Sequence, residues 1–170
     1  MKIIRISSDL SSASSDYFAQ AKLFVDEAFG KGTFHKQVCD DGIYQWLVVD
    51  FDVYGKGTVA GYCSTEIKQE GLLGILKTSV VHPDFRKMGI GDAMVKHRVK
   101  WLQEQDVQTI KSYAWFVDGV VPAQKMLMNN GFEPWGDIKG WWTNDHNWDY
   151  PCSVCGSKCK CVARVFIYEE

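Results

Sequence analysis

The chain has 170 residues, of which 46% are hydrophobic and 24% are charged, and its formal net charge at pH 7 is −2. This length and composition suit one globular domain with a sizeable core. The small net charge gives no indication of non-specific binding to nucleic acid or to a membrane surface. No apolar run approaches the roughly 18 residues that a membrane-spanning helix needs.

The N-terminal residues 1–5, Met-Lys-Ile-Ile-Arg, lack the apolar core and the cleavage site of a signal peptide. We therefore expect a cytoplasmic protein. In that compartment thiols stay reduced, so clustered cysteines indicate a metal before disulfides.

The first half of the chain predicts one helix among short strands. Residues 2–6 form the first strand, and apolar residues at near-helical spacing predict a helix over residues 16–29 that ends at Gly30. Three further strands are expected at residues 44–51, 58–67 and 72–81. Glycine-containing, hairpin-like turns separate these three strands.

The second half predicts two helices and three strands. A helix is expected at residues 88–104, and another begins at Pro122 and stops at Gly131. Strands are expected at residues 107–117, 135–143 and 163–168. The chain contains no repeat and no linker, so we expect residues 1–170 to form one α+β domain with a mixed sheet.

A short basic glycine loop, Arg86-Lys87-Met88-Gly89-Ile90-Gly91, separates the strand at 72–81 from the following helix. Backbone N–H groups at a helix start, with two cations beside them, form a natural phosphate cradle. A Rossmann fingerprint would need glycine or alanine at the position of Met94, and the Gly-Lys-Ser/Thr of a P-loop is absent. The loop therefore predicts a phosphate site of another kind.

Arg86, Gly89 and Gly91 match the acetyl-CoA loop pattern Gln/Arg-x-x-Gly-x-Gly/Ala, and here the chain resembles the GCN5-related N-acetyltransferase (GNAT) family. The proline-containing strand exit at residues 80–85 and the later Asn130-Gly131-Phe132 also resemble that family. The resemblance covers nearly all of the chain. It implies a mixed, mostly antiparallel sheet of about seven strands flanked by helices.

The resemblance also implies acetyl-CoA as co-substrate. Its pyrophosphate would lie on the loop and its pantetheine arm between the fourth and fifth strands, hydrogen-bonded to the fourth. The residues expected to bind it are Val80, Val81, Arg86, Lys87, Met88, Gly89, Ile90, Gly91 and Asp92. In this family a neutral amine attacks the thioester directly, which calls for a proton acceptor and a donor for the leaving thiolate.

The catalytic residues are less evident, because the family's frequent tyrosine acid is replaced by Leu127 and no carboxylate lies between residues 75 and 81. Glu66, late in the third strand, is the candidate base, and Tyr113, in the fifth strand, is the candidate acid. Two alternatives stay open: Glu66 as a solvated strand end, and Tyr113 as an ordinary half-buried strand residue.

Four cysteines, Cys152, Cys155, Cys159 and Cys161, lie within ten residues and begin like a zinc knuckle. Four thiolates suit tetrahedral Zn²⁺ in a structural role, and we expect residues 143–161 to form the zinc-binding loop. A pair of disulfides or free thiols is the alternative. We expect this zinc to order the aromatic loop 141–150 as one wall of the acceptor site. These aromatic residues could equally complete the core or form a homodimer interface.

The sequence thus predicts an N-acetyltransferase that moves acetyl from acetyl-CoA to a primary amine on a small molecule or peptide. We expect no nucleic-acid or membrane partner. The alternative is a weak or inactive acyl-CoA-binding protein whose zinc-knuckle loop binds a partner. The absent tyrosine and carboxylate favour this alternative. The intact loop favours the enzyme, and we therefore expect an enzyme.

Overall fold

The computed structural model describes residues 1–6, 12–30, 34, 44–50, 57–142, 155 and 159–169. Its strands are β1 (Lys2–Arg5), β2 (Tyr44–Asp50), β3 (Val59–Lys68), β4 (Leu73–Val81), β5 (Thr109–Phe116), β6 (Phe132–Lys139) and β7 (Val162–Tyr168). Its helices are α1 (Ser12–Phe29), the 3₁₀ turn η2 (Pro83–Phe85), α2 (Ile90–Glu104) and α3 (Gln124–Met128).

The described strands form one seven-stranded sheet in the order β1-β2-β3-β4-β5-β7-β6. Neighbouring strands run antiparallel except β4 and β5, which are parallel. A parallel pair needs a crossover connection, and α2 supplies it. The predicted fold, a mixed and mostly antiparallel sheet flanked by helices, is confirmed.

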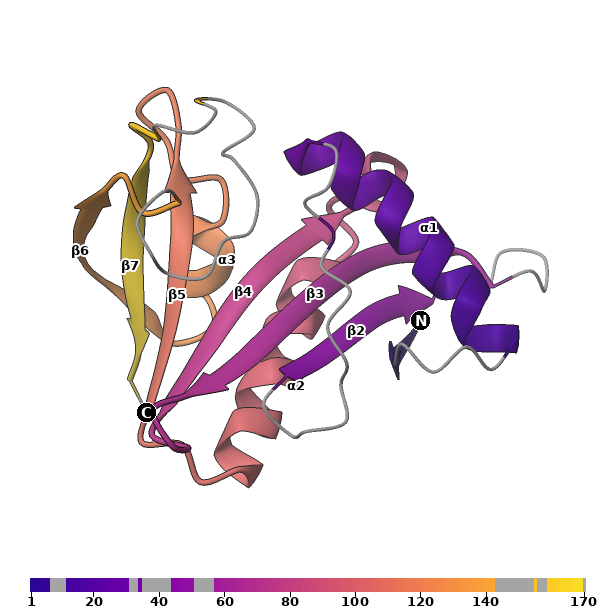
Figure 1. Cartoon of the computed structure of the whole chain (residues 1–170), viewed down its shortest axis with the longest axis horizontal. Helices are drawn as coiled ribbons and strands as arrows, with labels where there is room; N and C mark the ends of the chain where they lie inside the picture. The colour runs from indigo at the N-terminus through magenta and orange to yellow at the C-terminus, as the bar shows by residue number, and fades with distance from the viewer. Residues whose placement is uncertain are drawn as a thin grey trace.

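The helices cover opposite faces of the sheet, with α1 across the front and α2 behind in Figure 1. Tyr62 of β3 packs into a cluster with Phe24 and Val25 of α1. Its neighbour Cys63 packs with Ile90 and Met94 of α2. Adjacent strand residues point to opposite faces, so the two sides of the sheet are called the α1 face and the α2 face below.

Several predicted element boundaries were wrong. Helix α2 begins at Ile90 and not at residue 88, because Gly89 at its N-cap has a left-handed backbone with φ of 76°. The strand predicted at 135–143 is β6 at Phe132–Lys139, since the chain turns at Gly140, where φ is 67°. Helix α1 begins four residues earlier than predicted, at Ser12.

Strand β4 carries a bulge where it passes Ser64 of β3. Cys63 pairs with Ser79 and Thr65 pairs with Leu76, so Lys77 and Thr78 together face one residue of β3. A bulge of this kind bends the strand and increases its twist. It lies directly after Leu76, the last β4 residue that pairs with β5.

Beyond this point β4 and β5 diverge, as Figure 1 shows. Their parallel pairing is limited to Leu73–Leu76 against Thr109–Ser112, while β5 continues to pair with β7 up to Phe116. The sheet therefore opens into a gap between the last residues of β4 and the last residues of β5. None of the helices in the described part of the chain is long and apolar enough to cross a membrane.

Candidate active site

The loop that leads from β4 to α2 has the backbone of an anion cradle. Lys87 and Gly89 both have left-handed backbones, with φ of 66° and 76°. No side chain caps the start of α2, so the first N–H groups of this helix have no side-chain partner at the cap. Arg86, Lys87 and Met88 are exposed beside them. The arrangement can bind a phosphate through backbone N–H groups and adjacent cations.

The two glycines of this loop have different roles. A Cβ at Gly89 would meet no heavy atom within 4 Å, so this glycine serves the left-handed turn. A Cβ at Gly91 would lie 2.7 Å from the sulfur of Met126, so this glycine lets α2 approach the segment that carries α3. Asp92 accepts a hydrogen bond of 2.8 Å from Asn130 Nδ2, which ties the first turn of α2 to the end of α3.

Val80 and Val81 lie beyond the bulge, at the end of β4 that borders the gap. They pair with Tyr62 and Gly61 of β3 on one edge. On the other edge neither has a β5 partner among the described pairings. The carbonyl of Val81 accepts a hydrogen bond of 3.4 Å from Arg86 Nε, so the strand end and the loop are directly connected.

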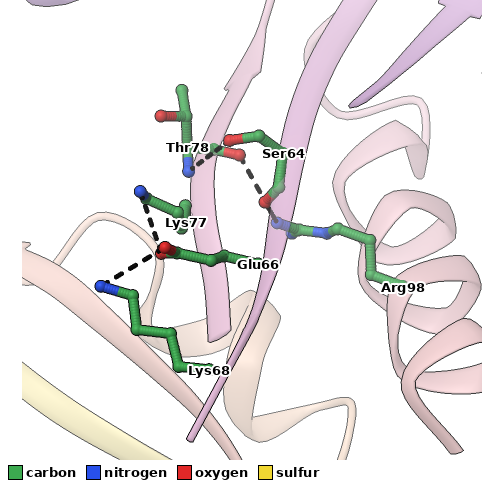
Figure 2. Close-up of polar contacts among 6 residues, drawn as sticks. All are labelled: Ser64, Glu66, Lys68, Lys77, Thr78 and Arg98. Carbon is green, nitrogen blue, oxygen red and sulfur yellow. Dashed lines mark hydrogen bonds and ion pairs between the residues drawn. The ribbon is translucent and has the colours of Figure 1, made fainter. Parts of the chain in front are cut away.

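Glu66 lies on the α1 face of β3, close to where the gap opens. It is 3% exposed, and both carboxylate oxygens are engaged. Lys77 Nζ lies 3.0 Å from Oε2 and Lys68 Nζ lies 3.3 Å from Oε1. Figure 2 shows the carboxylate between the two ammonium groups. We call Glu66, Lys68 and Lys77 the charged wall. Glu66 is therefore no solvated strand end, and its oxygens are already bound by cations.

Tyr113 is the first β5 residue after the last pair with β4. Its ring stacks on Trp141, with centroids 4.0 Å apart and planes 12° apart. Trp115 contacts Trp142 edge-on at 6.4 Å. We call these four residues the aromatic wall. Burial raises the pKa of Tyr113, so its phenol keeps its proton at neutral pH and can donate it.

Three of the predicted metal ligands come together beside the turn after β6, where the Gly140 N–H donates to the Cys161 carbonyl at 2.8 Å. The sulfurs of Cys155, Cys159 and Cys161 all lie within 4.8 Å of one another. The Cys161 N–H donates to Cys159 Sγ at 3.3 Å, which stabilises a thiolate. Cys152 lies outside the described residues. None of the three described cysteines of the cluster is in a disulfide.

Sequence reasoning missed two charged residues next to the gap. Lys77 directly follows the apolar start of β4, and Arg98 stands among the apolar residues of α2 that face the sheet. A cation within an apolar stripe is the signal that could have identified both. The predicted Tyr113 and Glu66 lie on the two sides of the gap, and nothing in the described structure joins them directly.

A family model for the acetyltransferase (GNAT) family matches residues 11–132. Among solved structures, Ard1 from Thermoplasma volcanium is 13% identical, with a TM-score of 0.65 over 99% of this chain and 98% of that chain. NAA60 of Arabidopsis thaliana, in complex with a bisubstrate analogue, is 13% identical, with a TM-score of 0.66 over 98% and 97% of the two chains.

A GNAT family acetyltransferase from Elizabethkingia anophelis with acetyl-CoA bound is 12% identical, with a TM-score of 0.63 over 99% and 97% of the two chains. At these identities the structures show a shared fold. A comparison with curated protein sequences gives no match. The family model covers well over half of the chain, and the sheet with its gap and its loop agrees with it. The chain therefore belongs to the acetyltransferase (GNAT) family and is an acetyl-CoA-dependent N-acetyltransferase.

Proposed function

We propose that acetyl-CoA binds with its pyrophosphate on the loop from Arg86 to Asp92 and its pantetheine arm along Val80 and Val81. The observation that carries this proposal is the end of β4–β5 pairing at Leu76 and Ser112, which leaves one edge of β4 facing the gap. The uncapped start of α2 and the left-handed Lys87 and Gly89 support the phosphate end. The arm and the phosphates would then follow one continuous stretch of backbone.

The acceptor is a primary amine on a small molecule or a peptide, approaching from the α1 face between the charged wall and the aromatic wall. Its nitrogen attacks the thioester carbon, a C–N bond forms, and the C–S bond breaks as the CoA thiolate leaves. Tyr113 donates a proton to that thiolate, because burial keeps its phenol protonated.

Glu66 draws the proton from the attacking amine, directly or through a water molecule. Its two lysine partners hold the carboxylate charged and compete for its oxygens. Its contribution as a base is therefore expected to be about tenfold in kcat, below the usual range for such a group.

The test is thiol release from acetyl-CoA with polyamines, aminoglycosides, amino acids and peptides as acceptors. We expect release with at least one class, and a lower kcat for Tyr113→Phe and Glu66→Gln with little change in the acetyl-CoA Kd. Tight binding of acetyl-CoA without release on any amine would instead support the acyl-CoA-binding alternative. An unchanged kcat in both variants would remove Glu66 and Tyr113 from the mechanism.

We also propose that Cys155, Cys159 and Cys161, together with Cys152, hold a structural Zn²⁺. Three thiols within 4.8 Å of one another and a backbone N–H on Cys159 Sγ fit a thiolate-bound soft metal. Four thiolates complete the tetrahedron and leave no position for substrate, so the metal would order the loop between β6 and β7. Such a site needs reduced thiols, in agreement with a cytoplasmic location.

Residues 1–170 are proposed to act as one acetyltransferase domain that contains this zinc-binding loop. The support is that the sheet includes strands from both ends of the chain, β1 and β7. The aromatic wall serves the acceptor in this proposal. If it formed a homodimer interface instead, gel filtration with light scattering would report a dimer that Trp142→Ala converts to a monomer.

A further inference from the structure

We propose that Arg98 is a positioning residue that fixes the β4 bulge and so orients the donor-binding edge of β4. This inference rests on the proposed pantetheine site at Val80 and Val81. Arg98 comes from α2 and reaches β3 and β4 from the α2 face, opposite the charged wall, as Figure 2 shows. It therefore acts through the strand and not on the substrate.

The guanidinium of Arg98 is fully buried, with 0% of the residue exposed. In the described part of the chain no carboxylate forms an ion pair with it, so the charge is held by neutral acceptors. Burial of an arginine without an ion pair is costly and is rarely retained without a reason. The acceptors that surround Arg98 indicate that reason.

Its donors meet the residues that form the bulge. Nη1 donates to the carbonyl oxygens of Ser64 and Thr78, at 3.3 and 3.4 Å. Nη2 donates to Ser79 Oγ at 2.7 Å, and Nε donates to the carbonyl of Met94 in its own helix at 3.2 Å. One rigid fork thus links α2, β3 and β4 at a single point.

A bulge breaks the regular ladder and leaves backbone groups that need other partners. Here the Thr78 N–H donates to Ser64 Oγ at 3.2 Å, and the Thr78 carbonyl accepts from Arg98. Two side chains therefore satisfy the extra residue of β4. Without these two side chains, the bulged pairing of β4 with β3 would lose stability relative to a regular pairing without the bulge.

The register has a functional consequence because it decides which backbone groups face the gap. Shifting a strand by one residue exchanges the groups that point to its two sides. Residues 79–81 follow the bulge directly, so the orientation of Val80 and Val81 depends on it. Arg98 would thereby set the backbone groups that the pantetheine arm meets, from the opposite face of the sheet.

The experiment compares wild type with Arg98→Met, Arg98→Lys and Ser79→Ala, using acetyl-CoA titration calorimetry and deuterium exchange of the free protein. We expect Arg98→Met to raise the acetyl-CoA Kd by about tenfold or more, as for a lost charged hydrogen-bond group. In the same variant, deuterium exchange should rise in peptides that cover residues 77–82 and should stay unchanged in peptides that cover β5. Arg98→Lys keeps the charge but not the fork, so its values should fall between wild type and Arg98→Met. Ser79→Ala loses one acceptor and should change Kd least.

Leu102→Ala is the matched control. Leu102 lies one turn further along α2, is fully buried and packs on Gly74, away from the bulge. It should lower stability while leaving the acetyl-CoA Kd within about twofold, since it touches no donor-binding group. An Arg98→Met variant with unchanged Kd and unchanged relative exchange would overturn the proposal.

If Arg98→Met does not fold, Arg98→Lys decides by the same two readouts. Equal Kd values for Arg98→Lys and wild type, with equal exchange at residues 77–82, would likewise overturn the proposal. Failure of wild type itself to bind acetyl-CoA would reject the donor site. The exchange comparison would then still report whether Arg98 holds the bulge.

Discussion

The charged wall and the aromatic wall flank the same gap, yet their side chains are held in different ways. On the β3–β4 side, Glu66 is buried at 3% exposure and ion-paired to Lys68 of its own strand and to Lys77 of β4. On the β5–β7 side, Tyr113 is held by the face of Trp141, a residue at the start of the segment that carries the cysteines. The residues of the first wall all lie on strands of the sheet, whereas Trp141 and Trp142 of the second wall lie in the turn that follows β6.

This difference separates the two tasks of the enzyme. In the proposed site, the donor would meet backbone groups of β4 and α2, whose geometry follows from hydrogen-bonded elements. The acceptor would meet side chains of the two walls, and in the proposal the aromatic side depends on how the zinc-binding loop between β6 and β7 is ordered. Changes on the two sides should therefore affect different properties of the protein.

The largest effect is expected from the cysteines. The Cys155→Ser/Cys159→Ser variant should lose the metal and raise the acceptor KM, while the acetyl-CoA Kd stays unchanged. In zinc-finger peptides such a site contributes roughly 10–16 kcal/mol of binding free energy, so its loss outweighs any single contact in the molecule. Metal content is measured by mass spectrometry. The buried Cys63, remote from the cluster in sequence, supplies the control Cys63→Ala, which should keep its metal. Full stability with unchanged acceptor kinetics in the double variant would contradict the proposal.

The second effect concerns the charged wall. Glu66→Gln leaves two ammonium groups beside a neutral amide in a poorly solvated place, and should lower the free energy of unfolding by about 3 kcal/mol. Lys68 is 31% exposed, so Lys68→Met should cost under about 1 kcal/mol. Urea denaturation measures both. Equal losses in the two variants would mean that the wall is not a desolvated ion cluster.

The third prediction concerns Tyr113→Phe, which should lower kcat by about tenfold through loss of the proton donor. Burial raises the pKa of Tyr113, so the folded protein binds the phenolic proton more tightly than the unfolded chain. That stabilisation is complete below the unfolded pKa, about 10, and is lost as pH rises through the higher folded pKa. The free energy of unfolding of Tyr113→Phe should therefore fall less steeply with rising alkaline pH than that of wild type. An identical alkaline profile in variant and wild type would argue against a buried phenol.

The smallest effect is expected at the exposed pair of Asp137 on β6 and Arg164 on β7, whose two hydrogen bonds measure 2.8 and 2.9 Å. Arg164 lowers the pKa of Asp137, so the pair contributes stability above the unfolded carboxyl pKa, and this is lost as pH falls through the folded one. Asp137→Asn should lower Tm slightly at pH 7 and not at pH 2. Glu133→Gln, exposed on the same strand, is the control. A Tm loss that persists in acid would assign the effect to packing.

Much of the fold could be predicted, because strands and helices carry their periodicity within a few residues. All seven strands and all three predicted helices occur near their expected places. The errors lie at boundaries set by backbone conformation, such as the left-handed Lys87, a non-glycine residue that no propensity would place there. The sequence predicted only a phosphate-binding role for Gly91. Its second role, to leave room for Met126, depends on how α2 packs against α3 and could not be predicted.

By itself, the sequence determined the features whose parts are neighbours in the chain: the loop at Arg86–Gly91, the cysteine cluster and the order of elements. Local spacing is enough there, because chain connectivity already brings the groups together. Tertiary structure alone decided the Glu66–Lys77 pair, the stack of Tyr113 on Trp141 and the contacts of Arg98 with β3 and β4. Their partners lie from 11 to 34 positions apart, and only sheet register and helix packing bring such residues within contact distance.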